Sequence, residues 1–256
     1  MKLTCKAVTD VGRKRKGNED NFCVNPEQKL FVVADGMGGH AAGEVAAGVA
    51  VESIENFIRR SHGTSDYSWP FGIDPSLSLD ANRLKTAVNL ANRRINRLAE
   101  NHDDYLAMAT TVVCALVADG HLVAAHVGDS RLYLRNADGL HQLTEDDSWA
   151  ATVLGGKGTN GGPAVRHVLT NVLGARPDTL VHVLERDLSG TDLLLLCSDG
   201  LHGSVPHDTL LELTASADDP ERLARRLVAA ALAHGSRDNI TVLIVGGCGN
   251  WAGNGH

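Results

Sequence analysis

Residues 30–40 read LFVVADGMGGH, an apolar run that ends in an acidic residue and a cluster of glycines. The run is rich in β-branched and aromatic residues, which predicts a buried strand. Asp35 stands at the mouth of that strand. Burial of a charge costs several kcal/mol unless the charge is paired or bound to a metal. The segment therefore predicts a buried sheet with a functional carboxylate at its end.

Around this strand, short β-rich runs alternate with pairs of helical segments. Apolar residues at helical spacing predict helices over residues 43–60, 80–101, 207–214 and 220–234. Strands are predicted over residues 3–8, 30–34, 110–117, 122–127, 132–134, 181–184, 193–197 and 240–245. The expected order is a strand, a helix pair, many strands, a second helix pair and a last strand.

Four Asp-Gly pairs occur, and their surroundings divide them into two kinds. Asp119-Gly120 and Asp138-Gly139 lie between predicted strands and indicate type I′ hairpin turns. Antiparallel hairpins between two helix pairs favour stacked sheets over a doubly wound parallel sheet. The expected fold class is α+β, with four layers in the order α/β/β/α: a central antiparallel β-sandwich flanked by antiparallel helix pairs.

Composition limits the class of protein. The 256 residues are 43% hydrophobic and carry a formal net charge of −7, with Lys and Arg scattered along the chain. Without a basic stripe, no nucleic-acid partner is expected. The first residues lack the apolar stretch of a signal peptide, and no apolar run is long enough to cross a bilayer. We therefore expect a cytoplasmic monomer without a membrane partner.

The domain organisation is expected to be simple. Residues 1–247 are expected to form a single domain, with a flap-like loop segment at 144–166 and a short C-terminal tail at 248–256. Residues 155–162 are rich in glycine, which indicates a surface loop rather than a domain linker. The five cysteines are far apart and lie mostly in apolar runs, which is typical of reduced core thiols.

Acidic residues recur at the ends of the predicted strands. They are Glu19, Asp20, Asp35, Asp129, Asp199 and Asp238. Any one of them is compatible with a solvated turn, but the set is harder to explain in that way. Oxygen ligands without a nearby Cys or His pair indicate hard ions, Mg²⁺ or Mn²⁺, rather than zinc.

Phosphate chemistry also needs a positively charged side chain to hold the phosphate group. Arg15, four residues before Glu19, is placed to provide it. Two ions about 4 Å apart and bridged by a carboxylate would activate a shared water and stabilise in-line displacement at phosphorus. The acidic set and Arg15 together predict hydrolysis of a phosphate ester.

Six short motifs now carry a family resemblance. They are RKGNED at 15–20, DGMGGH at 35–40, ATTV at 109–112, GDSR at 128–131, CSDG at 197–200 and SRDN at 236–239. In this order, the motifs resemble those of the bacterial branch of the metal-dependent Ser/Thr protein phosphatases, the protein phosphatase 2C family. The resemblance spans residues 9–245 and implies the same sandwich flanked by helix pairs.

The resemblance also implies an activity. It implies a phosphatase catalytic domain that hydrolyses phosphoserine and phosphothreonine in proteins by direct attack of a metal-bridging water or hydroxide. The implied cofactors are Mn²⁺ or Mg²⁺, with two ions in the core site and a third in bacterial relatives. The implied partners are phosphorylated Ser/Thr proteins, including a cognate Ser/Thr protein kinase, in signal transduction.

Carried over position by position, the resemblance assigns the first metal shell. Asp35 would bridge two ions, and the carbonyl of Gly36 would bind one of them. Asp199 and Asp238 would complete the shell of the first ion. The expected catalytic residues are Arg15, Asp35, Asp199 and Asp238.

The remaining roles follow in the same way. Glu19 and Asp20 would hold the second ion, partly through water, and Arg15 would bind the substrate phosphate. Asp129, together with Asp199, would hold the third ion. Asn239 and Thr111 are expected to support the site rather than to bind metal.

The chain departs from the family pattern in two places. Met37 stands where eukaryotic relatives carry a histidine proposed as general acid. The proton donor to the leaving group would then be a metal-bound water or, as second choice, His40. Relatives commonly have Asp-His-Ser where this chain has Asp146-Asp147-Ser148, and the flap that follows lacks the usual His-Pro. We expect Asp146 and Asp147 to be surface residues.

Two alternatives remain open. A serine ester hydrolase could use Ser130 in Gly128-Asp129-Ser130 with the Asp199-x-x-His202 pair, although Ser130 leads into a predicted strand rather than a helix. The other alternative is a non-catalytic, metal-free binding module of the same fold.

Overall fold

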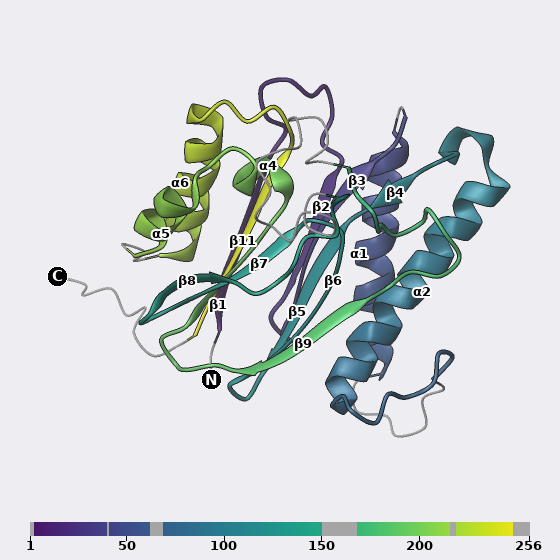
Figure 1. Cartoon of the computed structure of the whole chain (residues 1–256), viewed down its shortest axis with the longest axis horizontal. Helices are drawn as coiled ribbons and strands as arrows, with labels where there is room; N and C mark the ends of the chain where they lie inside the picture. Colours follow the sequence, from purple (N-terminus) through teal and green to yellow (C-terminus); the bar gives the residue numbers. More distant parts are fainter. Residues whose placement is uncertain (1–2, 40, 62–68, 150–167, 216–218, 248–256) are drawn as a thin grey trace.

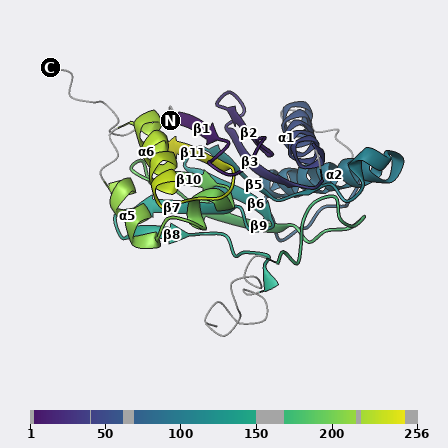
Figure 2. The same ribbon diagram turned by 90° about the horizontal axis from the view of Figure 1, so that it is seen from above.

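The protein folds into two stacked β-sheets with helices on both outer faces (Figures 1 and 2). The computed structural model describes residues 3–39, 41–61, 69–149, 168–215 and 219–247. Seen from above, α5 and α6 lie on one side of the sheets and α1 and α2 on the other (Figure 2). The predicted four-layer α+β fold is therefore confirmed.

Both sheets are antiparallel. The first contains, in spatial order, β1 (Thr4–Asp10), β11 (Ile240–Gly246), β10 (Leu193–Cys197), β7 (Arg131–Asn136) and β8 (Gly139–Gln142). The second contains β2 (Asp20–Asn25), β3 (Leu30–Met37), β5 (Val112–Ala118), β6 (His121–Val127) and β9 (His182–Asp187), and the short β4 (Ala109–Thr110) pairs with the end of β3.

The helices fall where apolar periodicity predicted them. They are α1 (Ala42–Ser61), α2 (Leu79–Asn101), α5 (His207–Ala215) and α6 (Pro220–Ala233), with a short helix α4 (Asp199–His202) and a 3₁₀ turn η1 (Asp103–Tyr105). Local capping fixes two of the starts: the Ser78 side chain accepts a hydrogen bond from Ala81 N, and the Asp219 side chain accepts one from Arg222 N. No described helix combines the length and the apolar character needed to traverse a bilayer.

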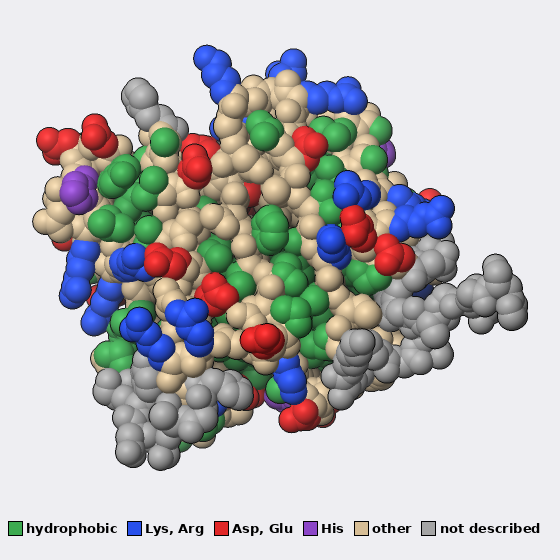
Figure 3. All heavy atoms as spheres, turned by 180° about the vertical axis from the view of Figure 1, so that it is seen from behind, with side chains coloured by type: hydrophobic (Ala, Val, Ile, Leu, Met, Phe, Trp, Pro, Cys, Tyr) green, Lys and Arg blue, Asp and Glu red, His purple; other side chains and the backbone are tan. Residues whose placement is uncertain are grey.

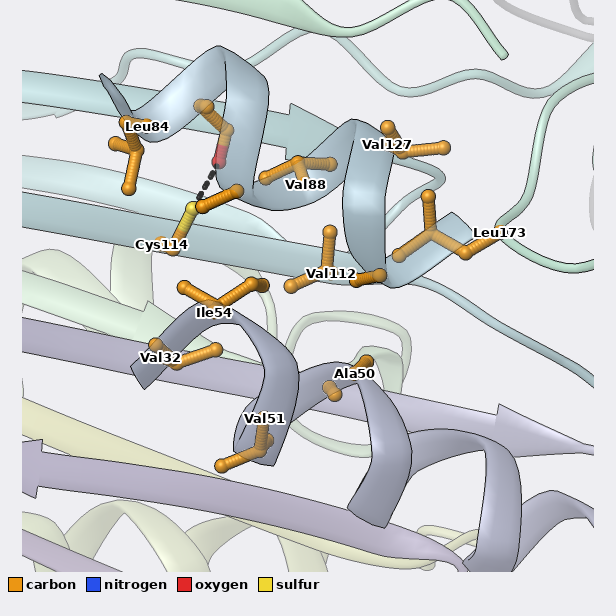
Figure 4. Packing of buried hydrophobic residues seen from close by; sticks show 14 of the residues in the cluster. Val32, Ala50, Val51, Ile54, Leu84, Val88, Val112, Cys114, Val127 and Leu173 are labelled. Atoms are coloured by element: carbon orange, nitrogen blue, oxygen red, sulfur yellow. Dashed lines mark hydrogen bonds between the residues drawn. The ribbon is translucent and has the colours of Figure 1, made fainter. Parts of the chain in front are cut away.

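Three apolar clusters hold the four layers together. One lies between the second sheet and the helices α1 and α2, one between the two sheets, and one between the first sheet and the helices α4 to α6. Figure 4 shows Val32, Ile54 and Val88 in the first of these.

Strand β3 shows why an uninterrupted apolar run is needed. Val32 and Ala34 face the helix layer, whereas Phe31 and Val33 face the other sheet. All four side chains are fully buried. Because successive side chains of a strand point to opposite faces, a strand in the middle of four layers must be apolar at every position.

The described cysteines do not form disulfides. Cys5, Cys23, Cys114 and Cys197 are free, and the last three are buried. Cys114 Sγ donates a hydrogen bond to the Ala125 carbonyl on the neighbouring strand (Figure 4). The prediction of reduced thiols is confirmed for these four; Cys248 lies outside the described residues.

The two hairpin turns differ from each other. Asp119 and Gly120 both have positive φ, 53° and 81°, which confirms a type I′ turn between β5 and β6. The second prediction is wrong in its detail. Asn136 pairs directly with Gly139, so the turn residues are Ala137 and Asp138, neither of which has a positive φ. Gly139, with φ of 139°, is the first residue of β8.

Apolar and charged side chains are both exposed on one face of the protein. On the face opposite to that of Figure 1, hydrophobic side chains gather near the middle, while Lys and Arg are interspersed with Asp and Glu around them (Figure 3). The edge strands β1 and β2 contribute partly buried apolar residues to the adjoining core. These include Cys5, Ala7, Phe22 and Val24, and Leu3, immediately before β1, packs against the same core.

Candidate metal centre

The strand ends that carry the acidic residues meet at one edge of the sandwich. Asp20 of β2 lies directly opposite Asp35 of β3. Burial raises the pKa of Asp35 well above its ordinary range, and neighbouring carboxylates raise it further. Those carboxylates belong to Asp20, Asp199, Asp238 and Asp129. Residues as far apart in the sequence as Asp20 and Asp238, which are 218 positions apart, thus lie near one carboxyl group, and such a concentration of negative charge favours a bound cation.

The Asp20 carboxylate is held by two hydroxyl groups. Its Oδ2 accepts hydrogen bonds from Ser198 Oγ at 2.8 Å and Thr241 Oγ1 at 2.6 Å. Burial nevertheless raises its pKa to about 6. Among the described residues, its buried Oδ1 has no hydrogen-bond partner. A buried acceptor without a partner is costly, so this oxygen is well suited to a cation or to a water bound to one.

Arg15 lies at the mouth of the site. Its guanidinium donates a hydrogen bond of 2.7 Å to Asp238 Oδ2, and the two side chains are 49% and 32% exposed. This contact, together with Asp238, Glu19 and Asp35 as nearby negative charges, raises the pKa of Arg15. Burial raises the pKa of Glu19, while Arg15 lowers it. An exposed arginine next to the carboxylates can reach a phosphate without a large desolvation cost.

Asn239 fixes the loop that carries these two residues. Its Oδ1 accepts a hydrogen bond from Glu19 N at 2.8 Å, and its Nδ2 donates to the carbonyls of Val11 and Gly17 at 2.8 and 3.0 Å. Gly36 adds a further contact, since its N donates to the Glu19 carbonyl at 3.1 Å. Asn239 therefore supports the site by holding the backbone around Glu19 in place, and not as a metal ligand.

Asp129 lies in a turn that other residues hold in place. It is 8% exposed, and burial, together with the charges of Asp199 and Asp146, raises its pKa to about 7. The Asp129 carbonyl accepts a hydrogen bond of 2.9 Å from His202 Nε2 of α4. Helix α4 begins at Asp199, so one short helix supplies both a carboxylate and an anchor for the Asp129 turn.

Thr111 connects the Asp129 turn to β3. Thr111 N donates to the Asp35 carbonyl at 2.9 Å, and its hydroxyl lies 2.8 Å from that of Ser130. Its place is consistent with the supporting role expected for it. The serine ester hydrolase alternative is not supported. Ser130 is only 1% exposed, and His202 bonds to a carbonyl rather than to the serine hydroxyl.

The donor set fits hard cations. Among the described residues, no three His, Cys, Asp or Glu side chains are already arranged to hold one ion by themselves. The carboxylates nevertheless raise one another's pKa, and one of them has a buried oxygen without a protein donor. Such a set suits Mg²⁺ or Mn²⁺, which keep water and main-chain oxygens among their ligands. His40 and residues 150–167 of the flap-like segment lie outside the described residues.

The expectation that Asp146 and Asp147 are surface residues is wrong. Asp146 forms a two-pronged ion pair with Arg131, with distances of 2.8 and 2.7 Å. Asp147 pairs with His182 at 2.8 Å. Their side chains are only 17% and 12% exposed. The sequence offered no local signal for these contacts, because each partner comes from a distant strand.

The chain is similar to proteins of one known family. The family model described as protein phosphatase 2C matches residues 13–234. The serine/threonine phosphatase stp of Listeria innocua is 35% identical over 248 residues, which cover 93% of each chain. The serine/threonine protein phosphatase PstP of Mycobacterium tuberculosis is 33% identical over 247 residues, which cover 94% of this chain and 44% of the relative.

Solved structures give the same result. The crystal structure of Mycobacterium tuberculosis PstP superposes with a TM-score of 0.80 at 32% identity, covering 96% of this chain and 98% of the other. The catalytic domain of PstP in complex with two manganese ions gives a TM-score of 0.78 at 33% identity, covering 95% and 97%. Stp1 from Staphylococcus aureus gives 0.83 at 31% identity, covering 96% of both chains. In sequence and fold, the chain belongs to the protein phosphatase 2C family.

Proposed function

We propose that this protein is a metal-dependent serine/threonine phosphatase that hydrolyses phosphoserine and phosphothreonine in other proteins at the acidic edge of its β-sandwich. The observation that carries the proposal is the convergence of buried and partly buried carboxylates around Asp35, beside the exposed Arg15. Metal-dependent hydrolases of phosphate esters combine anionic metal ligands with cationic groups that stabilise charge on the phosphate. The names of the relatives support the same activity.

Different acidic residues would bind different metal ions. Asp35 would serve both core ions, and the Gly36 carbonyl would serve one of them. Asp199 and Asp238 would serve the first ion, Glu19 and Asp20 the second, and Asp129 with Asp199 a third. The PstP relative that holds two manganese ions supports the core pair. When bound, Mn²⁺ or Mg²⁺ would acidify a water molecule and offset the negative charge that develops on the phosphate.

The residues of the chain would orient the substrate. Arg15 would exchange its contact with Asp238 for the phosphate oxygens, which a guanidinium binds in two-pronged fashion. Ser130 and Ser198 are buried and hydrogen-bonded, which disfavours either hydroxyl as a nucleophile. Water would therefore attack phosphorus directly, without a phosphoenzyme. His40 would be the second-choice proton donor to the leaving group, after a metal-bound water.

The proposal includes the extent of the domain, the oligomeric state, the location and the partner. The catalytic domain would comprise residues 1–247, with residues 248–256 as a tail, and the protein would act as a monomer in the cytoplasm. Its natural counterpart would be a Ser/Thr protein kinase of the same cell, in a signalling pathway.

The decisive experiment measures phosphate release from a phosphothreonine peptide. Wild type is assayed with Mn²⁺ and with EDTA, beside Asp35→Ala and Asp199→Ala variants checked for folding. Asp187→Ala is the matched control, because its carboxylate is 96% exposed on β9 and faces His121, away from the site. We expect EDTA and both site variants to lower the rate by orders of magnitude, and the control to leave it unchanged. A wild type that is inactive and fails to bind Mn²⁺ in calorimetry would favour the metal-free binding module.

A further inference from the structure

Asp147 joins three separate segments of the chain beside the acidic site. Its Oδ2 accepts hydrogen bonds from Gly128 N at 3.0 Å and from Asn171 Nδ2 at 2.8 Å. Its Oδ1 accepts one from His182 Nε2 at 2.8 Å. With three donors and 12% exposure, this carboxylate is a satisfied structural anchor rather than a solvated charge.

Backbone hydrogen bonds of Asp147 also join it to Gly128 and to the segment next to Asn171. Asp147 N donates to the Gly128 carbonyl at 3.0 Å, and the Asp147 carbonyl accepts from Thr170 N at 2.8 Å. Side chain and backbone together therefore bind both polar groups of Gly128. Two residues away, Trp149 N donates to the Val168 carbonyl at 2.8 Å.

His182 is itself held from its other side. Its ring stacks on that of His126, with 4.8 Å between centroids and 20° between planes. His126 Nε2 donates to the Glu145 carbonyl at 2.9 Å. The stacked rings of His126 on β6 and His182 on β9 thus hold residues 145–147 through hydrogen bonds to the Glu145 carbonyl and the Asp147 carboxylate. The Asp147 carboxylate in turn accepts a hydrogen bond from Gly128 N.

Gly128 is the residue immediately before Asp129, and its conformation allows little change. Its φ is +99°, and an added Cβ would lie 2.6 Å from Thr111 Cβ. The Asp129 carbonyl is bound to His202 on the other side of the turn. If the Gly128 contacts were lost, one of the two anchors of this turn would be lost with them.

We propose that Asp147 is a positioning residue that, braced by His182, holds the Gly128 backbone so that the Asp129 carboxylate stays directed at the acidic edge near Asp199. The inference rests on the proposed function and assigns a role to a residue that does not itself touch the substrate or the reacting atoms. Its effect would be exerted through Asp129.

A double-mutant cycle tests whether Asp147 acts through Asp129. The variants are Asp147→Ala, Asp129→Ala and the double variant, assayed for kcat and KM on a phosphothreonine peptide with Mn²⁺. We expect Asp147→Ala to lower kcat about tenfold with KM nearly unchanged, as for the loss of a hydrogen bond to a charged group. In the Asp129→Ala background the same change should cost less than about twofold.

Conservative and control variants separate positioning from general stability. Asp147→Asn keeps an acceptor oxygen for Gly128 N and should retain kcat within about threefold of wild type. Asp187→Ala removes a different His–Asp pair, formed by His121 of β6 and Asp187 of β9 at 2.9 Å, and should have no effect on kcat. If Asp147→Ala does not fold, His182→Ala replaces it in the cycle and should show the same non-additivity.

Calorimetry with Mn²⁺ alone gives a readout independent of turnover. The weakest Mn²⁺ binding event should be lost or weakened in both Asp129→Ala and Asp147→Ala, and kept in Asp187→Ala. Equal effects of Asp147→Ala with and without Asp129, or unchanged weak Mn²⁺ binding in Asp147→Ala, would overturn the inference. A wild type that binds Mn²⁺ but has no phosphatase activity would refute the proposed function and leave the calorimetric comparison to decide this one.

Discussion

At the scale of single residues, the pair formed by Arg15 and Asp238 combines a short distance with high exposure. The 2.7 Å contact is made by side chains that are 49% and 32% exposed. Exposed ion pairs of this kind contribute at most about 1 kcal/mol to the free energy of unfolding. The pair is therefore better suited to substrate binding than to stabilisation of the fold.

Replacing Arg15 should separate these two effects. We expect Arg15→Ala to raise KM for a phosphothreonine peptide about tenfold, because a charge-assisted contact to the phosphate is lost. The free energy of unfolding in urea should change by less than about 1 kcal/mol. Lys14→Ala, an exposed neighbour in the same loop, serves as control and should leave both quantities unchanged. An equal rise of KM in both variants would point to the general charge of the loop instead.

Several supporting residues had no signal in the sequence. Ser198 and Thr241 donate to Asp20, and Thr241 is 221 positions away from it. Hydroxyl residues next to apolar runs are common, and nothing local distinguishes one that faces a carboxylate. The acids themselves were predictable, because a charged residue at the end of a buried strand needs a reason to be there.

At the scale of elements, the start of helix α1 packs against the end of strand β3 through two glycines. A Cβ on Gly36 would lie 2.0 Å from the Gly43 carbonyl, and a Cβ on Gly43 would lie 2.9 Å from the Glu19 carboxyl group. The backbones approach this closely only because neither residue has a side chain. The contact places α1 directly behind the acidic edge.

Two glycines of α1 provide a matched pair. Gly43→Ala should lower the free energy of unfolding by about 2 kcal/mol through overpacking, and weaken Mn²⁺ binding by displacing Glu19. Gly48→Ala should instead raise that free energy by about 0.5–1 kcal/mol. At Gly48 the nearest neighbour of an added Cβ is Asn21 Nδ2, at an ordinary 3.6 Å. Urea unfolding of both variants with EDTA checks this, and a stable Gly43→Ala would show that the contact is loose.

Periodicity predicted long elements well and short ones poorly. The helices α1, α2, α5 and α6 begin and end within a residue or two of the predicted ranges. The four-residue helix α4 was not predicted, since a single turn has no apolar period. Strand β8 was also missed, and it is held by pairing with β7 rather than by its own composition.

At the scale of the whole molecule, convergence of the carboxylates makes the metal-free fold sensitive to pH. Burial raises the pKa of Asp129 from 3.8 to about 7 and that of Asp20 to about 6. Between about pH 4 and pH 7 the folded state therefore holds more protons than the unfolded chain. Stability from these groups is fully present below pH 4 and is lost as the pH rises through the folded pKa values.

The Asp129→Asn variant tests this balance because its side chain does not titrate. In EDTA, its free energy of unfolding should match that of wild type near pH 4 and exceed it by on the order of 3 kcal/mol at pH 8. Urea unfolding across that range measures the difference, with Asp187→Asn as an exposed control. Saturating Mn²⁺ at pH 8 should stabilise wild type more than the variant. A difference that does not change with pH would mean that Asp129 is not desolvated in the metal-free protein.

The layer order, the buried strands, the main helices and the acids at the strand ends could be predicted from the amino-acid sequence. Uninterrupted apolar runs and the charged residues that end them are local features, and the cost of burying a charge marks those residues as functional. The groups that satisfy these acids could not be predicted, because they are brought together only when the layers pack. Stacking of the two sheets brings Thr241 to Asp20, and the docking of β9 on β6 brings His182 to Asp147. Such pairings depend on distances between remote strand ends, which are set when the layers pack.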